Sequence, residues 1–393
     1  MKQAMIAAAR SVLGWLNAVF PKQRGKVVLA GFPDGEDSIL ELTRCLSGLD
    51  GIETVLLLDQ EGQNASRFGG NVTICRRRSV RGLWHFLTAR YVFFTHGLYL
   101  SPHPPKSQTC VNVWHGMPFK RIGHMIGRVP PNSSRVIATS PFFARLVAQA
   151  FDKPEGEVLI TGMPRNDVMV RAAAKSAEIK RAMGISMSGG GLPRLLLWLP
   201  TFRQGVRGII RTDGVSHDSI FGMDDMDVAA FAALLEQHNC VCIAKPHPMA
   251  AEYGDRLEGE RIRIWRDADL SARGLSLYDV VGATDVLITD ASSVYVDYLI
   301  LDRPVIIAFP DIDEYKATRG FSVDPVEDFL AGPIVRTFDQ LCESVTESLD
   351  RDSYAPRREQ IGSLFHADRD GGATDRLIAA VIPACRPAPS RAG

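Results

Sequence analysis

Short apolar segments alternate with longer stretches of helical periodicity along most of the chain. In the first half this pattern predicts strands at Val27–Phe32, Glu53–Leu58, Tyr91–Thr95, Thr109–Trp114, Arg135–Thr139 and Val158–Thr161. Helical spacing lies between these segments, for example over Pro141–Phe151 and Asp167–Met183. Strands that alternate with helices predict a parallel sheet that is covered by helices on both faces.

A second series of the same kind follows a loose, glycine-rich break at Gly184–Pro193, and we interpret residues 185–193 as a linker. The strands predicted beyond it are Leu195–Leu199, Val241–Ala244, Ile262–Trp265, Asp285–Thr289 and Val305–Phe309, with helices such as Met226–Gln237 and Ser292–Leu301. The predicted fold class is therefore α/β, with two Rossmann-like, doubly wound domains, residues 25–184 and 194–350, that face a cleft.

Both ends of the chain are predicted to lie outside these domains. Residues 1–24 are expected to form an amphipathic helix that is too short and too interrupted to span a bilayer, which takes about 20 apolar residues. One side of it would carry Met5, Val12, Trp15, Leu16, Val19 and Phe20 and lie in a membrane interface. The alternative is an ordinary helix packed on the first domain. Residues 351–383 are predicted to be helical, and residues 384–393 to form a disordered tail.

Composition adds little about partners, because the 45 Lys and Arg residues equal the 45 Asp and Glu residues in number. No nucleic-acid partner is predicted. Basic residues cluster in the first third of the chain, at Arg76, Arg77, Arg78, Arg81 and Arg90. Such a cluster favours binding to an anionic membrane surface or an acidic polymer. The alternative is the solvated start of a helix. The cysteines lack zinc or redox spacing, which favours buried thiols in a reducing cytoplasm.

Two histidines follow predicted strands, at the position where α/β proteins contact their ligands. His115 lies in Val113-Trp-His-Gly-Met-Pro-Phe-Lys120, and His247 lies in Lys245-Pro-His-Pro248. An imidazole with a pKa near ~6.5 is suited to general-base catalysis. We therefore expect His115 to be a base on one wall of the cleft and His247 to bind an anion on the other. The alternative for each is a structural histidine at the end of a strand.

The second half also contains a candidate phosphate site. Ser292 and Ser293 follow a strand and open a helix, where free amides favour an anion, although an ordinary N-cap would look the same. Residues at neighbouring strand ends are expected to complete a diphosphate and nucleotide site: Thr201, Arg203, Lys245 and Thr289, with Asp297 accepting a ribose hydroxyl or being a surface acid. The acids of Met223-Asp-Asp-Met-Asp227 match a helix N-terminus better than a metal. No cofactor or bound metal is expected, and magnesium at most shields substrate phosphates.

Several motifs in a fixed order carry a family resemblance between about Val27 and Thr337. They are Trp114-His-Gly-Met-Pro-Phe-Lys120, Thr139-Ser140 with Phe142-Phe143, Gly162-Met-Pro-Arg-Asn-Asp167, Leu199-Pro-Thr-Phe-Arg203, Pro246-His-Pro248, Asp285-Val-Leu-Ile-Thr-Asp-Ala-Ser-Ser-Val-Tyr-Val-Asp-Tyr-Leu299, Asp302-Arg-Pro304, Asp313-Glu-Tyr315, Arg319-Gly-Phe321 and Gly332-Pro-Ile334. The chain resembles the CDP-glycerol glycerophosphotransferase family, the teichoic-acid primases and polymerases. Departures include Ala291 where the family usually has Tyr, and Gly31-Phe-Pro-Asp-Gly-Glu-Asp37 where an Asp-Asn-Pro is common.

This resemblance implies a GT-B-like fold and transfer of glycerol phosphate from CDP-glycerol to a hydroxyl of a lipid-linked or polymeric acceptor, with release of CMP. It places His115 with Gly116, Lys120, Arg165 and Asn166 on the acceptor side. The product would be a teichoic-acid-like or capsular polymer, made by a peripheral enzyme at the cytoplasmic face of the membrane. The motifs are compatible with a primase and with a polymerase. They are also compatible with glycerol phosphate and with ribitol phosphate as the transferred group. The rivals are a GT-B glycosyltransferase or epimerase that uses a nucleotide sugar, and a non-catalytic envelope scaffold.

Overall fold

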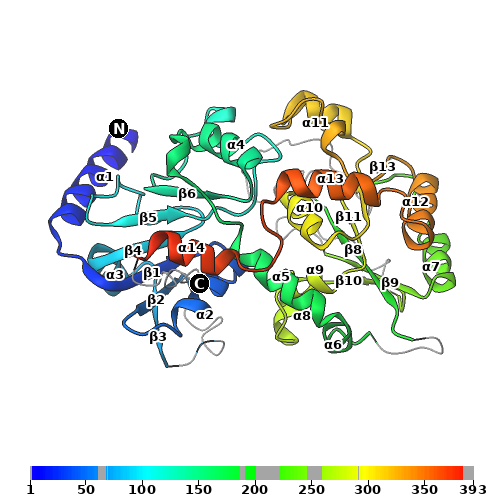
Figure 1. Cartoon of the computed structure of the whole chain (residues 1–393), viewed down its shortest axis with the longest axis horizontal. Helices are drawn as coiled ribbons and strands as arrows, with labels where there is room; N and C mark the ends of the chain where they lie inside the picture. The colour runs from blue at the N-terminus through cyan, green and yellow to red at the C-terminus, as the bar shows by residue number, and fades with distance from the viewer. Residues whose placement is uncertain are drawn as a thin grey trace, which may run out of the picture. The chain divides into compact units, whose positions relative to one another are not determined.

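The computed structural model describes residues 2–60, 68, 70–185, 191–200, 222–245, 259–290 and 292–383. The chain forms two compact units, each built on one sheet (Figure 1). Unit 1 comprises Met1–Met117, Ile122–Asp167 and Ala367–Gly393, and unit 2 comprises Pro118–Arg121 and Val168–His366. Both units mix parallel strands with helices, which confirms the predicted α/β class.

Unit 1 contains a 7-stranded parallel sheet of order β3-β2-β1-β4-β5-β6-β7. The strands are β1 (Gln23–Ala30), β2 (Glu53–Leu58), β3 (Val72–Arg76), β4 (Ala89–Phe94), β5 (Thr109–Asn112), β6 (Arg135–Ala138) and β7 (Val158–Ile160). The order reverses at β1, which lies between β2 and β4 as in a doubly wound fold. β3 was missed because this edge strand is mostly half-buried and carries no apolar run.

Helices cover both faces of this sheet. They are α1 (Lys2–Val19), α2 (Asp37–Leu46), α3 (Val80–Thr88), α4 (Pro141–Phe151) and α14 (Ala373–Val381), with 3-10 turns at Gly123–Ile126 and Glu155–Glu157. Val28 and Val55 belong to a core that also takes in side chains of α1 and α3. Val27 and Leu29 have the opposite strand parity and are fully buried as well. α14 packs beside α2 although the two helices are far apart in sequence (Figure 1).

Unit 2 repeats the arrangement with a 6-stranded parallel sheet of order β10-β9-β8-β11-β12-β13. The strands are β8 (Arg194–Leu199), β9 (Cys240–Ala244), β10 (Ile262–Ile264), β11 (Val286–Thr289), β12 (Val305–Ala308) and β13 (Ile334–Val335). The helices are α5 (Pro164–Ala174, which begins in unit 1), α6 (Ser176–Ala182), α7 (Val228–Gln237), α8 (Asp267–Ala272), α9 (Leu277–Ala283), α10 (Ser293–Tyr298), α11 (Ile312–Thr318), α12 (Phe338–Asp350) and α13 (Ala355–Phe365), with 3-10 turns at Leu299–Leu301 and Val326–Phe329. The reversal of strand order at β8 makes this unit Rossmann-like too, as predicted.

The division between the units differs from the predicted linker at residues 185–193. Unit 2 already begins at Val168, because α6 packs against α9 and because Met169 and Ala172 of α5 lie close to Gly282 of α9. An ion pair of 2.6 Å between Lys180 and Asp285 fixes α6 to this unit. The predicted C-terminal segment 351–383 is divided as well, with α13 in unit 2 and α14 in unit 1. The carboxylate of Asp167 accepts hydrogen bonds from Ala373 N and Thr374 N, so it caps α14 rather than its own helix.

The predicted N-terminal helix is present as α1, but its faces differ from the prediction. Leu16 and Phe20, which were expected on the membrane side, pack against the core of unit 1. The outward side instead carries Met5, Val12, Trp15 and Val19, whose side chains are 59–69% exposed. Among the described residues no helix is long and apolar enough to cross a bilayer.

Candidate functional site

The carboxyl ends of β1, β4 and β5 form one edge of the unit 1 sheet. Because these strands are neighbours, the segments after them lie side by side at the point where the strand order reverses. The segments are Gly31–Asp34 after β1, Thr95–Gly97 after β4 and Val113–Gly116 after β5. Ligands of doubly wound folds bind at this place, and His115 lies in the third segment.

The backbone around His115 is held in an unusual shape. Trp114 adopts a φ of 52°, and its N–H donates to Asn112 Oδ1 at 2.9 Å. Gly116 adopts a φ of 136°, a region that residues with a Cβ rarely occupy. On the other side, Arg165 Nη1 donates to the His115 carbonyl oxygen at 2.9 Å. Local contacts therefore fix where His115 leaves the sheet.

Three rings gather at this edge. The rings of His96 and His115 stack with centroids 4.3 Å apart and an interplanar angle of 9°. Trp114 lies 4.0 Å from His115 and 5.7 Å from His96. Phe151 of α4 supports Trp114 edge-on at 5.0 Å, and the exposed Phe32 contacts His96 edge-on at 5.3 Å. These rings hold the His115 imidazole at the edge of the sheet where doubly wound folds bind their ligands.

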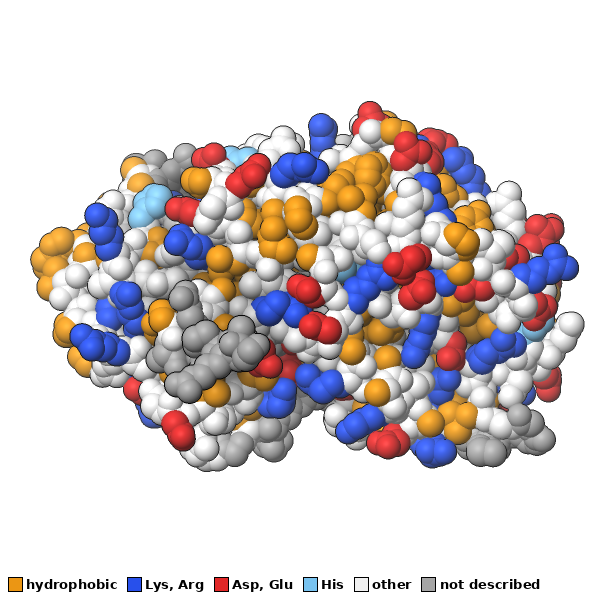
Figure 2. All heavy atoms as spheres, viewed as in Figure 1, with side chains coloured by type: hydrophobic (Ala, Val, Ile, Leu, Met, Phe, Trp, Pro, Cys, Tyr) orange, Lys and Arg blue, Asp and Glu red, His pale blue; other side chains and the backbone are white. Residues whose placement is uncertain are grey.

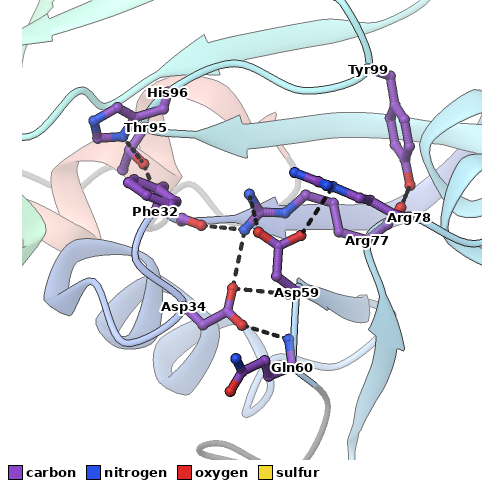
Figure 3. A network of polar contacts seen from close by, with 10 residues as sticks. Phe32, Asp34, Asp59, Gln60, Arg77, Arg78, Thr95, His96 and Tyr99 are labelled. Atoms are coloured by element: carbon purple, nitrogen blue, oxygen red, sulfur yellow. Dashed lines mark hydrogen bonds and ion pairs between the residues drawn. The ribbon is translucent and has the colours of Figure 1, made fainter. Parts of the chain in front are cut away.

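A polar network lies next to Phe32 and His96 (Figure 3). Arg77 donates to the carbonyl oxygen of Gly31 and lies 3.3 Å from Asp34 and 3.6 Å from Asp59. The carboxylate of Asp34 also accepts the backbone N–H groups of Asp59 and Gln60. The Arg77 carbonyl in turn accepts the Tyr99 hydroxyl at 2.5 Å. The network joins the ends of β1, β2 and β3 with the loop after β4.

The sequence interpretation assigned no role to His96 and did not single out Arg77. Arg77 was read as one of a run of surface cations, yet its side chain points into the network between β1 and β2 while Arg78 is exposed. Desolvation by the surrounding protein atoms and then the Arg77 charge lower the pKa of His96 to about 4, although His96 is an exposed residue. A signal for His96 was present, because it follows a strand just as His115 does.

The other residues predicted for the acceptor side, Arg165, Asn166 and Lys120, do not share one environment, because the first two are buried in unit 1 and the third belongs to unit 2. Arg165 is buried and donates to the His115 carbonyl oxygen, and this position favours a role in holding the backbone around His115. Burial raises the pKa of the neighbouring Glu36 and the Arg165 charge opposes that shift. Asn166 is buried, and its amide has no hydrogen-bond partner among the described residues. Lys120 belongs to unit 2 instead of the acceptor-side domain, because its segment pairs with Phe321.

In unit 2 the carboxyl ends of β9, β8 and β11 are also adjacent. Lys245 follows β9 and forms a 2.7 Å ion pair with the exposed carboxylate of Asp267. Ser292 follows β11 and is the N-cap of α10, and Ser293 is the first residue of that helix. Topology therefore brings Lys245 and the serine pair to one edge, as the sequence predicted. Thr201, Arg203 and His247, together with Ala291, lie outside the described residues.

Two predicted donor-site residues are buried in the fold. Thr289 is fully buried, and its hydroxyl donates to the Leu199 carbonyl at 2.7 Å, which ties β11 to β8. Asp297 is also fully buried, and its carboxylate accepts the Tyr278 hydroxyl at 2.5 Å. These contacts favour structural roles, contrary to the predicted phosphate and ribose contacts. A strand-end threonine and an acid one turn into a helix look the same in sequence whether they face a ligand or the core.

No cluster of three or more His, Cys, Asp or Glu side chains suited to a metal ion occurs within the described ranges. The expectation that the protein needs no bound metal stays a prediction.

Sequence comparison with known proteins finds similarity over most of the chain. The family model described as CDP-glycerol:poly(glycerophosphate) glycerophosphotransferase matches residues 16–383. The chain is 29% identical over 304 residues to the teichoic acid ribitol-phosphate polymerase TarK of Staphylococcus aureus, covering 74% of this chain and 56% of TarK. It therefore spans little more than half the length of that relative. The teichoic acid ribitol-phosphate primase of Bacillus spizizenii is 24% identical over 96% of this chain and 97% of its own length.

Among solved structures, the wall teichoic acid polymerase TagF superposes with a TM-score of 0.77 and 20% identity, over 96% of this chain and 93% of that one. This likeness shows that the fold is GT-B-like, as predicted. Other solved forms of TagF carry a histidine replaced by asparagine and soaked with CDPG, or a histidine replaced by alanine.

Proposed function

Because the chain belongs to the CDP-glycerol:poly(glycerophosphate) glycerophosphotransferase family, we propose that it transfers an alditol phosphate from a CDP-alditol to an acceptor hydroxyl and releases CMP. CDP-glycerol is the proposed donor, and the acceptor is a lipid-linked or polymeric chain of a teichoic-acid-like or capsular polymer. The observation that carries the proposal is the placement of His115, held by backbone and ring contacts at the ligand-binding edge of the unit 1 sheet.

The reaction requires a base, because an alcohol is too weakly acidic to attack the diphosphate bond of a CDP-alditol at neutral pH. We assign this role to His115. As the acceptor oxygen bonds to the phosphorus that bears the alditol, the hydroxyl proton passes to the His115 imidazole. The bond between that phosphorus and the bridging oxygen breaks, and CMP leaves with the electron pair. A histidine suits this step since its ordinary pKa is near ~6.5.

Charge that develops on the departing CMP must be neutralised. Lys245 and the hydroxyls of Ser292 and Ser293 support a donor site at the carboxyl edge of the unit 2 sheet. His247 is proposed as the imidazole that donates a hydrogen bond to a phosphate oxygen, and Thr201 with Arg203 as further donors. Lys245 forms an ion pair with Asp267. A diphosphate bound at Lys245 would therefore either displace the Asp267 carboxylate or bind the Lys245 ammonium group together with it.

On the acceptor side, Gly116 allows the turn that presents His115, and Arg165 holds the carbonyl of the same residue. We propose that Arg165 acts through His115 and that Asn166 contributes its buried amide to the acceptor site. The exposed Phe32 next to His96 offers an apolar surface for the carbon backbone of an alditol unit.

The alternative donor is CDP-ribitol, because the family description names glycerol whereas the compared relatives TarK and the primase are ribitol-phosphate enzymes. The test is CMP release by the purified chain from CDP-glycerol, CDP-ribitol and nucleotide sugars, with and without a membrane acceptor. We expect acceptor-dependent CMP release from CDP-glycerol. Faster release from CDP-ribitol would reassign the donor. Turnover of a nucleotide sugar alone would favour a GT-B glycosyltransferase or epimerase, and binding without any turnover would favour a scaffold.

We also propose a peripheral location on the cytoplasmic face of the membrane, where a lipid-linked acceptor would be found. Figure 2 shows apolar side chains along the edge of unit 1 over α1, with Lys and Arg side chains nearby. The exposed apolar residues Val80 and Trp84 of α3 add to those of α1, and the two helices are in contact. The cations Arg10 and Arg81 are exposed on the same helices. This combination suits the interface of an anionic bilayer.

A further inference from the structure

His96 lies directly after β4 and has no part in the transfer step described above. We propose that His96 is a positioning residue for His115, whose ring plane it fixes by face-to-face stacking. The inference rests on the proposed role of His115 as the base. It concerns how that base is held and adds no group that touches substrate.

The contact between the two imidazoles is nearly parallel, with a centroid separation of 4.3 Å and an angle of 9°. Asn112 and Arg165 already hold the backbone on either side of His115. The remaining freedom is rotation about the side-chain torsions, and the terminal torsion of histidine is broad when nothing packs against the ring. Stacking on His96 restricts that torsion, and the ring of Trp114 at 4.0 Å limits it from a second direction.

His96 can serve as a support because its own ring is fixed. Phe32 contacts it edge-on at 5.3 Å, and Thr95 Oγ1 lies 3.0 Å from His96 Nδ1. The Phe32 N–H already donates to Thr95 Oγ1 at 3.0 Å, so the hydroxyl is available to donate its own proton to His96 Nδ1. Figure 3 shows this contact, which restrains the His96 ring whichever of its two nitrogens carries the proton.

The charge environment separates the roles of the two histidines. The charged group that acts on His96 is Arg77, which itself forms ion pairs with Asp34 and Asp59. Burial and then Arg77 keep the pKa of His96 near 4, so its ring is neutral at neutral pH. A neutral partner leaves His115 able to accept a proton without a second imidazolium 4.3 Å away, which would repel it.

A double-mutant cycle on the purified full chain tests the proposal through catalysis. The variants are His96→Ala, His96→Phe, His115→Ala and the His96→Ala/His115→Ala pair, with His103→Ala as a control at an exposed histidine of unit 1. We expect His96→Ala to lower kcat about tenfold through loss of orientation, with the donor KM unchanged. His96→Phe, which keeps a stacking ring, should recover most of the rate. In the His115→Ala background, His96→Ala should cause no further loss. An equal loss in both backgrounds would overturn the proposal.

A second measurement decides the matter without turnover. In protein with isotope-labelled histidine, the ring resonances of His115 should move in His96→Ala, because a stacked ring is removed, and should stay near their wild-type position in His103→Ala. Unchanged His115 resonances in His96→Ala would overturn the stacking. If no CDP-alditol releases CMP, the proposed function fails, and this comparison still decides whether His96 sets the His115 ring.

Discussion

At the scale of single residues, the account depends on two histidines at the edge of the unit 1 sheet, His96 and His115, whose rings stack with centroids 4.3 Å apart. His115 was identified from its place after a strand, and the structure puts it at the edge where the strand order reverses. Arg165 and Asp297 were assigned to ligands, yet both are buried against protein groups. Sequence spacing does not reveal the direction in which a polar side chain points. His96 was passed over because its importance depends on a ring that comes from another strand.

The low pKa of His96 makes stability depend on pH. A histidine in the unfolded chain has a pKa of about 6.5, whereas folding lowers the pKa of His96 to about 4. Between these values only the unfolded chain binds a proton at this residue, so the free energy of unfolding falls as pH falls through the window. We expect His96→Phe to lose less stability than wild type between neutral and mildly acidic pH in denaturant titrations, with His103→Phe as the control. An identical pH dependence in His96→Phe and wild type would contradict the shift.

At the scale of elements, periodicity predicted most strands and several helices closely. Pro141–Phe151 was predicted with the bounds that α4 has, because Ser140 accepts the Phe143 N–H and Pro141 opens the helix. The short strands β3 and β13 were missed, because an edge strand and a two-residue strand carry little apolar pattern. Local sequence could not predict that most of α5 belongs to unit 2. That assignment depends on the contact of Met169 and Ala172 in α5 with Gly282 in α9, which is far away in the sequence.

The contact between α9 and α5 depends on Gly282. A Cβ at this glycine would lie 2.4 Å from the Met169 carbonyl oxygen and 2.6 Å from the Ala172 Cβ. We expect Gly282→Ala to push α5 away and to lower the free energy of unfolding by about 1–3 kcal/mol, as overpacking commonly does. Gly156→Ala is the control, because a Cβ there meets nothing within 4 Å. Equal melting temperatures for the two variants would show that α5 does not pack against α9 in this way.

At the scale of the whole molecule, the predicted pair of Rossmann-like units is confirmed, whereas their bounds differ from the predicted linker. Each unit is built from segments that are not continuous in sequence. The sequence prediction assumed that each domain is one continuous segment, so it could not find these crossings between the units. The motif around His115 is divided in the same way. Met117 ends a unit 1 segment, while Phe119 packs among Tyr295, Phe321 and Phe365 of unit 2.

Membrane attachment is also a property of the whole molecule. We expect wild-type protein to co-sediment with vesicles that contain phosphatidylglycerol, and less with neutral phosphatidylcholine vesicles. Val12→Glu with Trp15→Ser should weaken binding to the anionic vesicles at least about tenfold, because each large apolar side chain that enters the interface contributes about 1.5–3 kcal/mol. Leu364→Glu, at an exposed apolar residue of α13, is the matched control. Undiminished binding by the double variant would exclude α1 as the attachment surface.

The central claim is that His115 removes the acceptor proton during alditol phosphate transfer. The measurement that tests it most directly is single-turnover CMP release by wild type and His115→Ala, combined with a binding titration of each with CDP-glycerol. We predict that His115→Ala binds the donor as wild type does but releases CMP about 10²–10⁴-fold more slowly, the usual range for loss of a general base. CMP release by His115→Ala at the wild-type rate would contradict the account.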